Sequence, residues 1–280
     1  MTKFKQGLCA AGLLGAMALA MPAAAAPFGV TAPGGNSFTA DEMVISSEGL
    51  AMITLTDTAP PPGLSDFDTF VEFGLVAAVD FQLNNSNLGA GVTGLGVDYQ
   101  VFATYNFGGF IALVPPDLFA IMTSGGGTIW LDTNLAPGLD VGASNIGDLT
   151  LAAGAGSCLI SSFGLGNPAF PDGACSFLFD FDPNGAFWHE GNPAGPLLGV
   201  TTMAVDINID QLAFGNNPGG QTGAITSLAQ IDACLLDGEN GGSCALTADH
   251  DGSARIPEPG SLALLGAALL GLGFFRRRKS

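Results

Sequence analysis

No lysine or arginine occurs between Gln6 and Ala254, and this absence limits what the chain can fold into more than any other feature. The seven basic residues are Lys3, Lys5, Arg255, Arg276, Arg277, Arg278 and Lys279. Because carboxylates in the long middle section have no basic partners, we expect no internal salt bridges there. Each carboxylate must be solvated, accept a hydrogen bond from a neutral donor or bind a cation. Fold stability should therefore come from apolar burial and backbone pairing.

The same charge pattern excludes nucleic acids as partners. Residues 26–256 hold 24 of the 25 acidic side chains, all except Glu258, and one basic side chain, which gives a net charge near -23. Binding to nucleic acid phosphates requires Lys or Arg to displace condensed counterions. An anionic membrane surface would repel this section for a related reason.

The N-terminal segment has the parts of a secretory signal peptide. Two lysines precede an apolar run from Gly7 to Met21, and small residues continue to Ala26. Because signal peptidase accepts proline poorly directly after the cut, we place cleavage between Ala25 and Ala26. Residues 1–25 are thus a predicted signal peptide that engages the Sec machinery and signal peptidase. An uncleaved membrane anchor is the alternative.

The C-terminal segment, residues 256–280, has three parts in a fixed order. These are Pro257-Glu258-Pro259-Gly260, an apolar stretch to residue 275, and the basic cluster Arg276-Arg277-Arg278. As a helix, the apolar stretch would be roughly 24 Å long, short against a hydrocarbon core of about 30 Å. Basic residues stay on the cytoplasmic side. We expect transient insertion of this helix into the inner membrane.

This tail resembles the PEP-CTERM sorting signal of Gram-negative bacteria. The resemblance implies processing by an exosortase at the Pro257-Glu258-Pro259 region, in organisms that make an extracellular polysaccharide matrix. It also implies a final location at the cell surface or in that matrix. An ordinary C-terminal membrane anchor is the alternative.

Between the two ends, short β-rich runs alternate with clusters of Gly, Pro, Asn and Asp, which is typical of an all-β fold. In the clearest run, Val205, Ile207 and Ile209 fall on one face and polar residues on the other. We predict a single β-sandwich-like, acidic domain at residues 26–248 and a linker at 249–255. Two runs, Phe119–Met122 and Leu228–Leu236, fit either short helices or strands. The remaining expected strands are Met43–Ile45, Ala51–Thr56, Thr69–Leu83, Gly96–Phe107, Thr128–Leu131, Leu149–Leu151, Ser176–Phe181 and Thr201–Ile209.

The body also resembles the flocculation-associated PEP-CTERM protein family. The matching runs are Ala26–Phe28, Gly94–Ala103, Gly127–Asp132 and Ser176–Phe181. The resemblance implies a matrix-associated protein that helps cells aggregate, and it brings no catalytic residues.

Four cysteines remain after signal cleavage, namely Cys158, Cys175, Cys234 and Cys244. An even number in an exported protein indicates disulfides. Of the three possible connectivities we favour local pairing, Cys158 with Cys175 and Cys234 with Cys244, because both pairs bracket Gly/Pro-rich loops. Catalytic or zinc-binding thiols are the alternative.

One run resembles the first half of a calcium loop. Asp180, Asp182 and Asn184 alternate before Gly185, and Glu190 follows one place short of the usual bidentate ligand. The candidate calcium ligands are therefore Asp180, Asp182, Asn184 and Glu190. A plain Asp-Pro-Asn-Gly turn between two strands explains the same residues.

The sequence has few features of a catalytic site. His189 and His250 are the two imidazoles, and no Gly-x-Ser-x-Gly elbow occurs. Trp188, beside His189, fits either a sugar-contact patch or a tryptophan packed at a strand end. We expect no enzyme activity and no cofactor other than the possible calcium ion.

The leading hypothesis is an exported, exosortase-processed, non-enzymatic protein of the cell surface or matrix that promotes flocculation or biofilm formation with exopolysaccharide. The first alternative is a calcium-dependent glycan-binding β-sandwich module. The second is a secreted glycan hydrolase, because such enzymes need only two suitably placed carboxylates.

Overall fold

Antiparallel strands dominate the structure, a computed structural model that describes residues 25–56, 64–114, 117–135, 142–161, 172–190, 195–196 and 201–256. Residues 27–256 form one compact unit. The expected sorting helix and nearly all of the expected signal peptide lie outside the described residues.

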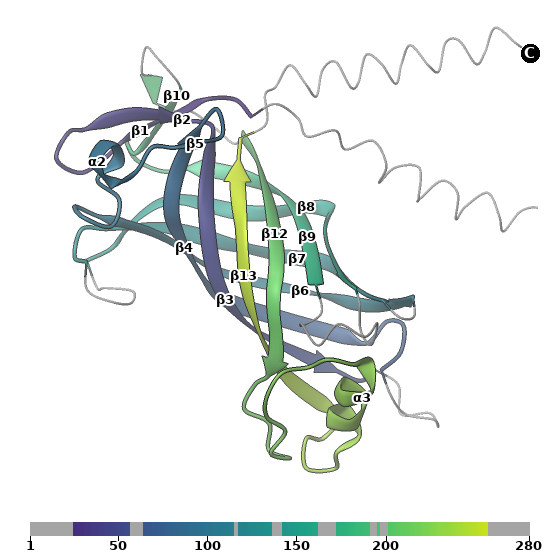
Figure 1. The fold of residues 1–280 in the computed structure, drawn as a ribbon. Coiled ribbons are helices and arrows are strands. Elements are labelled where there is room, and N and C mark those ends of the chain that lie inside the picture. The colour runs from purple at the N-terminus through teal and green to yellow at the C-terminus, as the bar shows by residue number, and fades with distance from the viewer. Residues whose placement is uncertain are drawn as a thin grey trace, which may run out of the picture. The chain divides into compact units, whose positions relative to one another are not determined.

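Eight long strands close into an antiparallel barrel (Figure 1). Each strand pairs with the next one in the barrel, and β3 pairs with both β4 and β13, which joins the first strand to the last. The short strand β5 (Ser86–Asn87) extends the sheet from β4. The eight strands are β3 (Glu42–Thr54), β4 (Thr69–Leu83), β6 (Gln100–Val114), β7 (Asp117–Asp132), β8 (Ser144–Ser161), β9 (Asp172–Pro183), β12 (Thr201–Phe214) and β13 (Ser243–Arg255).

Alternation of apolar and polar residues places one face of each strand inside the barrel. In β9, Phe177, Phe179 and Phe181 are buried, while the intervening Ser176, Leu178 and Asp180 are exposed. Phe107 of β6 stacks on Phe177, with ring centroids 5.1 Å apart. The apolar core therefore lies in the interior of the barrel.

The expectation of an all-β fold is confirmed, but the structure has a closed barrel where a sandwich was expected. Period-two alternation buries one face of a strand in either architecture, so it does not distinguish them. The distinction depends on the pairing of β3 with β13, which joins residues such as Met43 and Ala254.

The expected linker at residues 249–255 is instead the second half of β13. This section pairs with β3 on one side and β12 on the other. His250 and Ala254 are buried, while Asp249 and Asp251 are exposed. The linker prediction was wrong because the polar Asp-His-Asp-Gly run follows strand alternation, and its backbone completes the barrel.

The expectation of no internal salt bridge was also wrong, because Arg255 at the end of β13 forms one. Its guanidinium pairs with the carboxylate of Asp206 on β12. Ser176 on β9 donates its hydroxyl to the same carboxylate at 2.8 Å. Arg255 therefore ties two neighbouring strands together near the end of the domain.

Other carboxylates accept hydrogen bonds from neutral donors, as expected. Asp68 is fully buried and accepts the backbone N–H groups of Thr56 at 2.8 Å and Ser65 at 2.7 Å. The hydroxyls of the same two residues lie within 3.2 Å of its oxygens. Local donors thus compensate this carboxylate for the loss of water.

A small second sheet lies at one end of the barrel (Figure 1). Its strand order is β11 (Gly195–Pro196), β10 (Trp188–Glu190), β1 (Phe28–Thr31) and β2 (Ser37–Ala40). Trp188 packs edge-on against Phe181 of the barrel, with ring centroids 5.6 Å apart, and also contacts Phe28 at 5.7 Å. The short helix α2 (Ala90–Thr93) contacts β2.

Helix α3 (Leu228–Leu236) lies at the other end and contacts β13. It settles the ambiguity at residues 228–236 as a helix, whereas residues 119–122 belong to β7. The Gln230 side chain accepts the backbone N–H of Ser227 at 3.0 Å, which caps the start of α3. Among the described residues, no helix has the length and apolar character needed to cross a membrane.

Candidate functional site

Both predicted disulfides are present. Cys158 on β8 is bonded to Cys175 on β9, and Cys234 on α3 is bonded to Cys244 on β13. The first joins directly opposed residues of adjacent strands. The second ties α3 to the second residue of the closing strand β13, so each disulfide has at least one cysteine on a barrel strand.

The four candidate calcium ligands are distributed over β9, the turn after it and β10. Asp180 and Asp182 are on the outer face of β9, and Asn184 is exposed in the turn after it. Glu190 belongs to β10 in the small sheet, where its backbone pairs with Phe28. Within the described residues, no three His, Cys, Asp or Glu side chains form a group suited to a metal ion. Calcium binding stays a prediction, and Gly185, with a φ of 74°, fits the plain turn.

The residues predicted for processing lie at or beyond the limits of the described structure. Ala25 and Ala26 are its first two residues. Pro257, Glu258, Pro259, Gly260, Arg276, Arg277 and Arg278 are outside it. Their roles rest on sequence.

Trp188 is a packed residue rather than an exposed sugar platform. Its side chain is 1% exposed, and its indole N–H donates to the carbonyl of Ile146 at 2.8 Å. Phe187 packs edge-on against it at 4.9 Å. The alternative that we gave for Trp188, a tryptophan packed at a strand end, is therefore confirmed.

The described barrel contains a cluster of four polar side chains that sequence analysis missed. Ser47, Glu72, Tyr105 and His250 come from β3, β4, β6 and β13, respectively. The Ser47 hydroxyl lies 3.1 Å from Nδ1 of His250, and the Tyr105 hydroxyl donates to Oε1 of Glu72 at 3.0 Å. Nε2 of His250 is 3.7 Å from the same Glu72 oxygen. We call these four residues the polar cluster.

Two glycines make room for the polar cluster. Gly49 and Gly74 are paired across β3 and β4. A Cβ at either position would lie 2.6 Å from the Tyr105 hydroxyl oxygen, and one at Gly49 would also lie 2.7 Å from Glu72. Such distances are too short for non-bonded atoms, so the cluster requires glycine on both strands.

Burial disfavours the charged forms of His250, Glu72 and Tyr105 in the polar cluster. It lowers the pKa of His250 to about 4, against a weaker opposing effect of Asp249. It raises the pKa of Glu72, although the hydrogen bond from Tyr105 acts in the opposite direction. The pKa of Tyr105 is raised by burial and then by the neighbouring Glu72. All three shifts follow from the cost of placing charge in an apolar interior.

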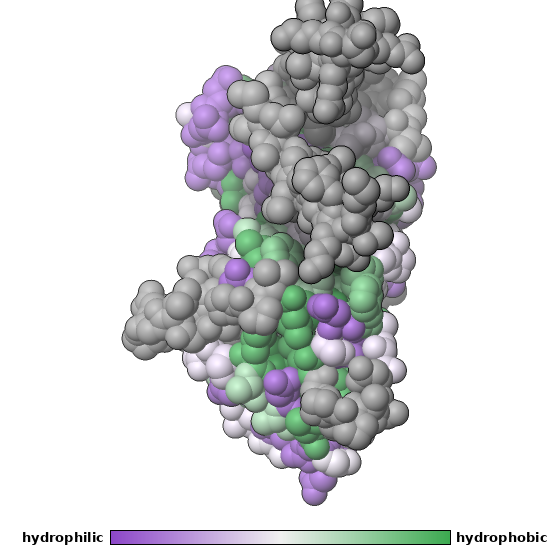
Figure 2. Space-filling model, turned by 90° about the vertical axis from the view of Figure 1, so that its right-hand side faces the viewer, coloured by the Kyte–Doolittle hydropathy of each residue, from purple (hydrophilic) through white to green (hydrophobic). Residues whose placement is uncertain are grey.

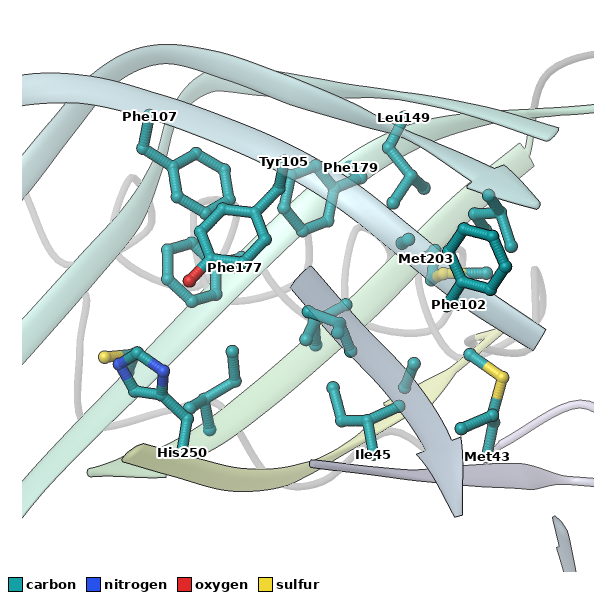
Figure 3. A pocket seen from close by; sticks show the side chains of 18 of the residues that line it. Met43, Ile45, Phe102, Tyr105, Phe107, Leu149, Phe177, Phe179, Met203 and His250 are labelled. Carbon is teal, nitrogen blue, oxygen red and sulfur yellow. The ribbon is translucent and has the colours of Figure 1, made fainter. Parts of the chain in front are cut away.

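An apolar cavity of about 70 Å³ adjoins the polar cluster (Figure 3). Glu72, Tyr105 and His250 line one part of it, while Phe102, Met43 and Met203 lie in another part. A second cavity of about 50 Å³ is lined by Phe70, Met122 and Ile231. Both cavities share Glu72, His250 and Cys158 in their linings, so the polar cluster lies between them.

The cluster combines a serine, a histidine and an acid, but its histidine is a poor general base near neutral pH. Efficient general bases have pKa values near the operating pH, whereas that of His250 is about 4. Ser47 is also only 7% exposed. The cluster therefore offers hydrogen-bonding groups but no efficient general base near neutral pH.

A weak signal for this cluster existed in the sequence. Phe70, Glu72 and Val76 share one face of β4, which makes Glu72 a single acid in an inward-facing series. The outer face of the same strand is also apolar, so the inward face could not be identified. Its partner His250 lies in the run that was predicted as a linker, so nothing in the sequence indicated that the two residues meet.

The outer surface has a groove of about 920 Å³ across β3, β4, β6, β12 and β13. Its lining combines apolar Leu50, Phe73 and Leu75 with polar Glu48 and Asp249. Phe73 is 50% exposed. Large apolar residues reach the surface in several places, and Figure 2 shows one strip of apolar surface bordered by polar side chains.

Comparison with known protein families finds the PEP-CTERM protein-sorting motif at residues 255–279. This motif marks an exported protein of Gram-negative bacteria that an exosortase processes. The match covers the tail, and the resemblance of the body to flocculation-associated proteins stays a prediction. No curated protein and no solved structure matches the chain.

Proposed function

We propose that this protein is a non-enzymatic component of the cell surface or extracellular matrix that promotes flocculation or biofilm formation with exopolysaccharide. The observation that carries the proposal is the sorting motif at residues 255–279, which begins at the last residue of the barrel-closing strand β13. Exosortase processing would therefore deliver a folded barrel, rather than a flexible chain, to the surface.

The barrel has properties suited to that location. Two disulfides cross-link it, and such bonds persist in oxidising extracellular surroundings. Its excess of carboxylates favours solubility and mutual repulsion between copies. A matrix protein with these properties would remain dispersed among polymer chains until a specific contact holds it.

The outer groove provides a surface for a glycan contact, which supports matrix association. Sugars bind to grooves that combine an exposed ring with hydrogen-bonding side chains. Phe73 supplies the ring, and Glu48, Gln211 and Thr247 supply hydrogen-bonding groups. Because the domain is strongly acidic, we propose a neutral or amine-bearing polysaccharide rather than a polyanion.

The sorting step and the matrix role can be tested separately in the native bacterium. Replacing Pro257, Glu258 and Pro259 by alanine should prevent processing and reduce floc size, whereas Glu239→Ala, at an exposed position, should leave both unchanged. Fractionation followed by immunoblotting reports processing, and light scattering reports floc size. If complete deletion of the protein leaves flocs unchanged, the matrix role is wrong while sorting stands.

Glycan binding is a second candidate function, favoured by the groove. Phe73→Ala should reduce retention of the processed protein on the host's polysaccharide at least threefold. Val79→Ala is the matched control, because Val79 is 55% exposed on the same strand and lies outside the groove lining. EDTA in the same assay tests calcium: undiminished retention and melting temperature would remove the calcium-dependent form of this function.

A further inference from the structure

We propose that the outer groove binds a polysaccharide that carries protonated amino groups, rather than a neutral one. The inference rests on the glycan contact proposed above and specifies the chemical class of the glycan. Its basis is charge complementarity: two exposed carboxylates lie in the groove lining beside the exposed ring of Phe73.

The two carboxylates belong to Glu48 and Asp249, which are directly opposed on neighbouring strands. Their backbones are paired in the register of β3 and β13, and both side chains are exposed on the outer face. Within the described residues, neither carboxylate has a hydrogen-bond or ion-pair partner. Side chains opposed in this way have Cβ atoms about 4.5–5.5 Å apart, and like charges there are destabilising.

The barrel has no spare basic side chain to neutralise this pair. Arg255 is the only lysine or arginine in residues 26–256, and its guanidinium is paired with Asp206. A cationic ligand would therefore relieve the repulsion between the two carboxylates. It would also be attracted over a longer range by the excess negative charge of the domain.

An ammonium group suits the carboxylate pair better than a calcium ion does. Calcium takes roughly six to eight oxygen ligands. In the part of the chain that the structure describes, no third acidic, histidine or cysteine side chain joins the pair to make a group suited to a metal ion. An ammonium group needs fewer partners, because it donates up to three hydrogen bonds, which it can share between the two carboxylates and water.

Phe73 places an apolar surface next to the carboxylate pair. It is opposite Leu50 on β3, two positions along the strand from Glu48. Diagonal neighbours of this kind on adjacent strands are about 7–8 Å apart. A sugar ring packed over Phe73 would therefore hold an amino group within reach of Glu48.

A second groove, of about 650 Å³, continues from the first, since both are lined by Phe73, Thr104 and Tyr105. No charged side chain lines this second groove; its other lining residues are Asn106, Gly125, Gly126, Gly127, Thr128, Leu149 and Thr150. Glycine within a strand often marks the close approach of a ligand to the backbone. A neutral surface with hydroxyl and amide groups suits the hydroxyls of a polymer of sugars and offers no matching charge to a cationic peptide.

Two oligosaccharides of equal length test the proposal on the processed protein. One is an oligomer of glucosamine, and the other is the same oligomer with every amino group acetylated. At mildly acidic pH, where the free amines are protonated, isothermal titration calorimetry should show at least tenfold tighter binding of the glucosamine oligomer. Equal binding of the two would overturn the inference. An oligomer of lysine with the same number of charges should bind more weakly than the glucosamine oligomer, and equal binding would overturn the inference as well, because charge alone would then explain it.

A pair of double variants locates the contact. Glu48→Gln combined with Asp249→Asn should weaken binding of the glucosamine oligomer at least fivefold and leave that of the acetylated oligomer unchanged. Glu239→Gln combined with Asp251→Asn is the matched control, because it removes the same number of charges from exposed positions outside the groove lining. An equal loss in the two double variants would show that the amines respond only to the overall charge of the domain, which would overturn the inference.

The same assay separates this inference from the proposed function. If both oligomers bind equally and Phe73→Ala weakens both, the glycan contact stands and the preference for amines is wrong. If neither oligomer binds and the host's polysaccharide is not retained, the glycan contact itself is wrong, and the inference falls with it.

Discussion

The hydroxyl oxygen of Ser47 on β3 lies 3.1 Å from Nδ1 of His250 on β13, although 203 positions separate the two residues in the chain. The contact exists because β3 and β13 pair directly, with Ser47 opposite His250 in the register. This pairing closes the barrel and also assembles the polar cluster. Barrel closure and the polar cluster therefore both depend on β13.

The polar cluster predicts a specific dependence of stability on pH. Burial lowers the pKa of His250 from 6.5 to about 4, so the unfolded state binds this proton more tightly than the folded state. His250 thus contributes fully to stability above pH 6.5, and its contribution is lost as the pH falls toward 4. The loss is about 3 kcal/mol, since a tenfold change in proton affinity is worth about 1.4 kcal/mol.

Glu72 acts with the opposite sign, because its pKa is raised. Its contribution is full below the ordinary value of 4.5 and declines as the pH rises. Urea denaturation of the wild type, His250→Gln and Glu72→Gln at several pH values separates the two effects. His250→Gln should remove part of the rise in stability between about pH 4 and 6.5. Identical profiles for this variant and the wild type would contradict the assignment.

Gly49→Ala should disturb the polar cluster. The new methyl group would lie 2.6 Å from the Tyr105 hydroxyl oxygen and 2.7 Å from Glu72. We expect a loss of about 1–3 kcal/mol, typical of overpacking. Tyr105→Phe in the same chain removes one clashing atom and should recover part of that loss. Gly91→Ala, with open space around it, is the control, and an equal effect there would contradict this explanation.

Each disulfide should contribute to stability through the loop that it closes. The bonded cysteines are 17 residues apart in Cys158–Cys175 and 10 apart in Cys234–Cys244. Replacing either pair by alanine should lower the free energy of unfolding by about 2–4 kcal/mol. Denaturation of both variants with and without a reductant checks the effect. A third variant that lacks both pairs is the control for the reductant. If the reductant destabilises the wild type no more than this variant, the disulfides contribute nothing to stability.

The exosortase cleavage site should lie after Ile256. Residues 249–254 pair with both β3 and β12, Arg255 pairs with β12, and Ile256 is 6% exposed. A chain ending at Ile256 should therefore fold, whereas one ending at Ala248 should lose its tertiary structure. Near-ultraviolet circular dichroism of the two chains makes the comparison.

Intact mass spectrometry of the native product checks the same prediction in the cell. The measured mass should place the C-terminal residue at Ile256 or beyond it. A folded product that ends before Asp249 would contradict the role of β13 in closing the barrel.

Local patterns were sufficient for several features of this protein. The alternation at Val205, Ile207 and Ile209 predicted a strand, and their positions in β12 confirm it. The two cysteine pairs were also predicted correctly, because each pair is close in the sequence and brackets a turn-rich loop. Features of this kind depend on neighbours within about twenty residues.

The sequence by itself determined that the body is an acidic β structure with two local disulfides, followed by a sorting motif. Alternation, composition and short motifs are properties of neighbouring residues, so they can be recognised before the fold is known. The tertiary structure decided that the sheet closes into a barrel, that residues 249–255 form a strand and that Ser47, Glu72, Tyr105 and His250 meet. These features depend on pairing between strands as distant as β3 and β13, and a period of two residues identifies the faces of a strand without identifying its partner.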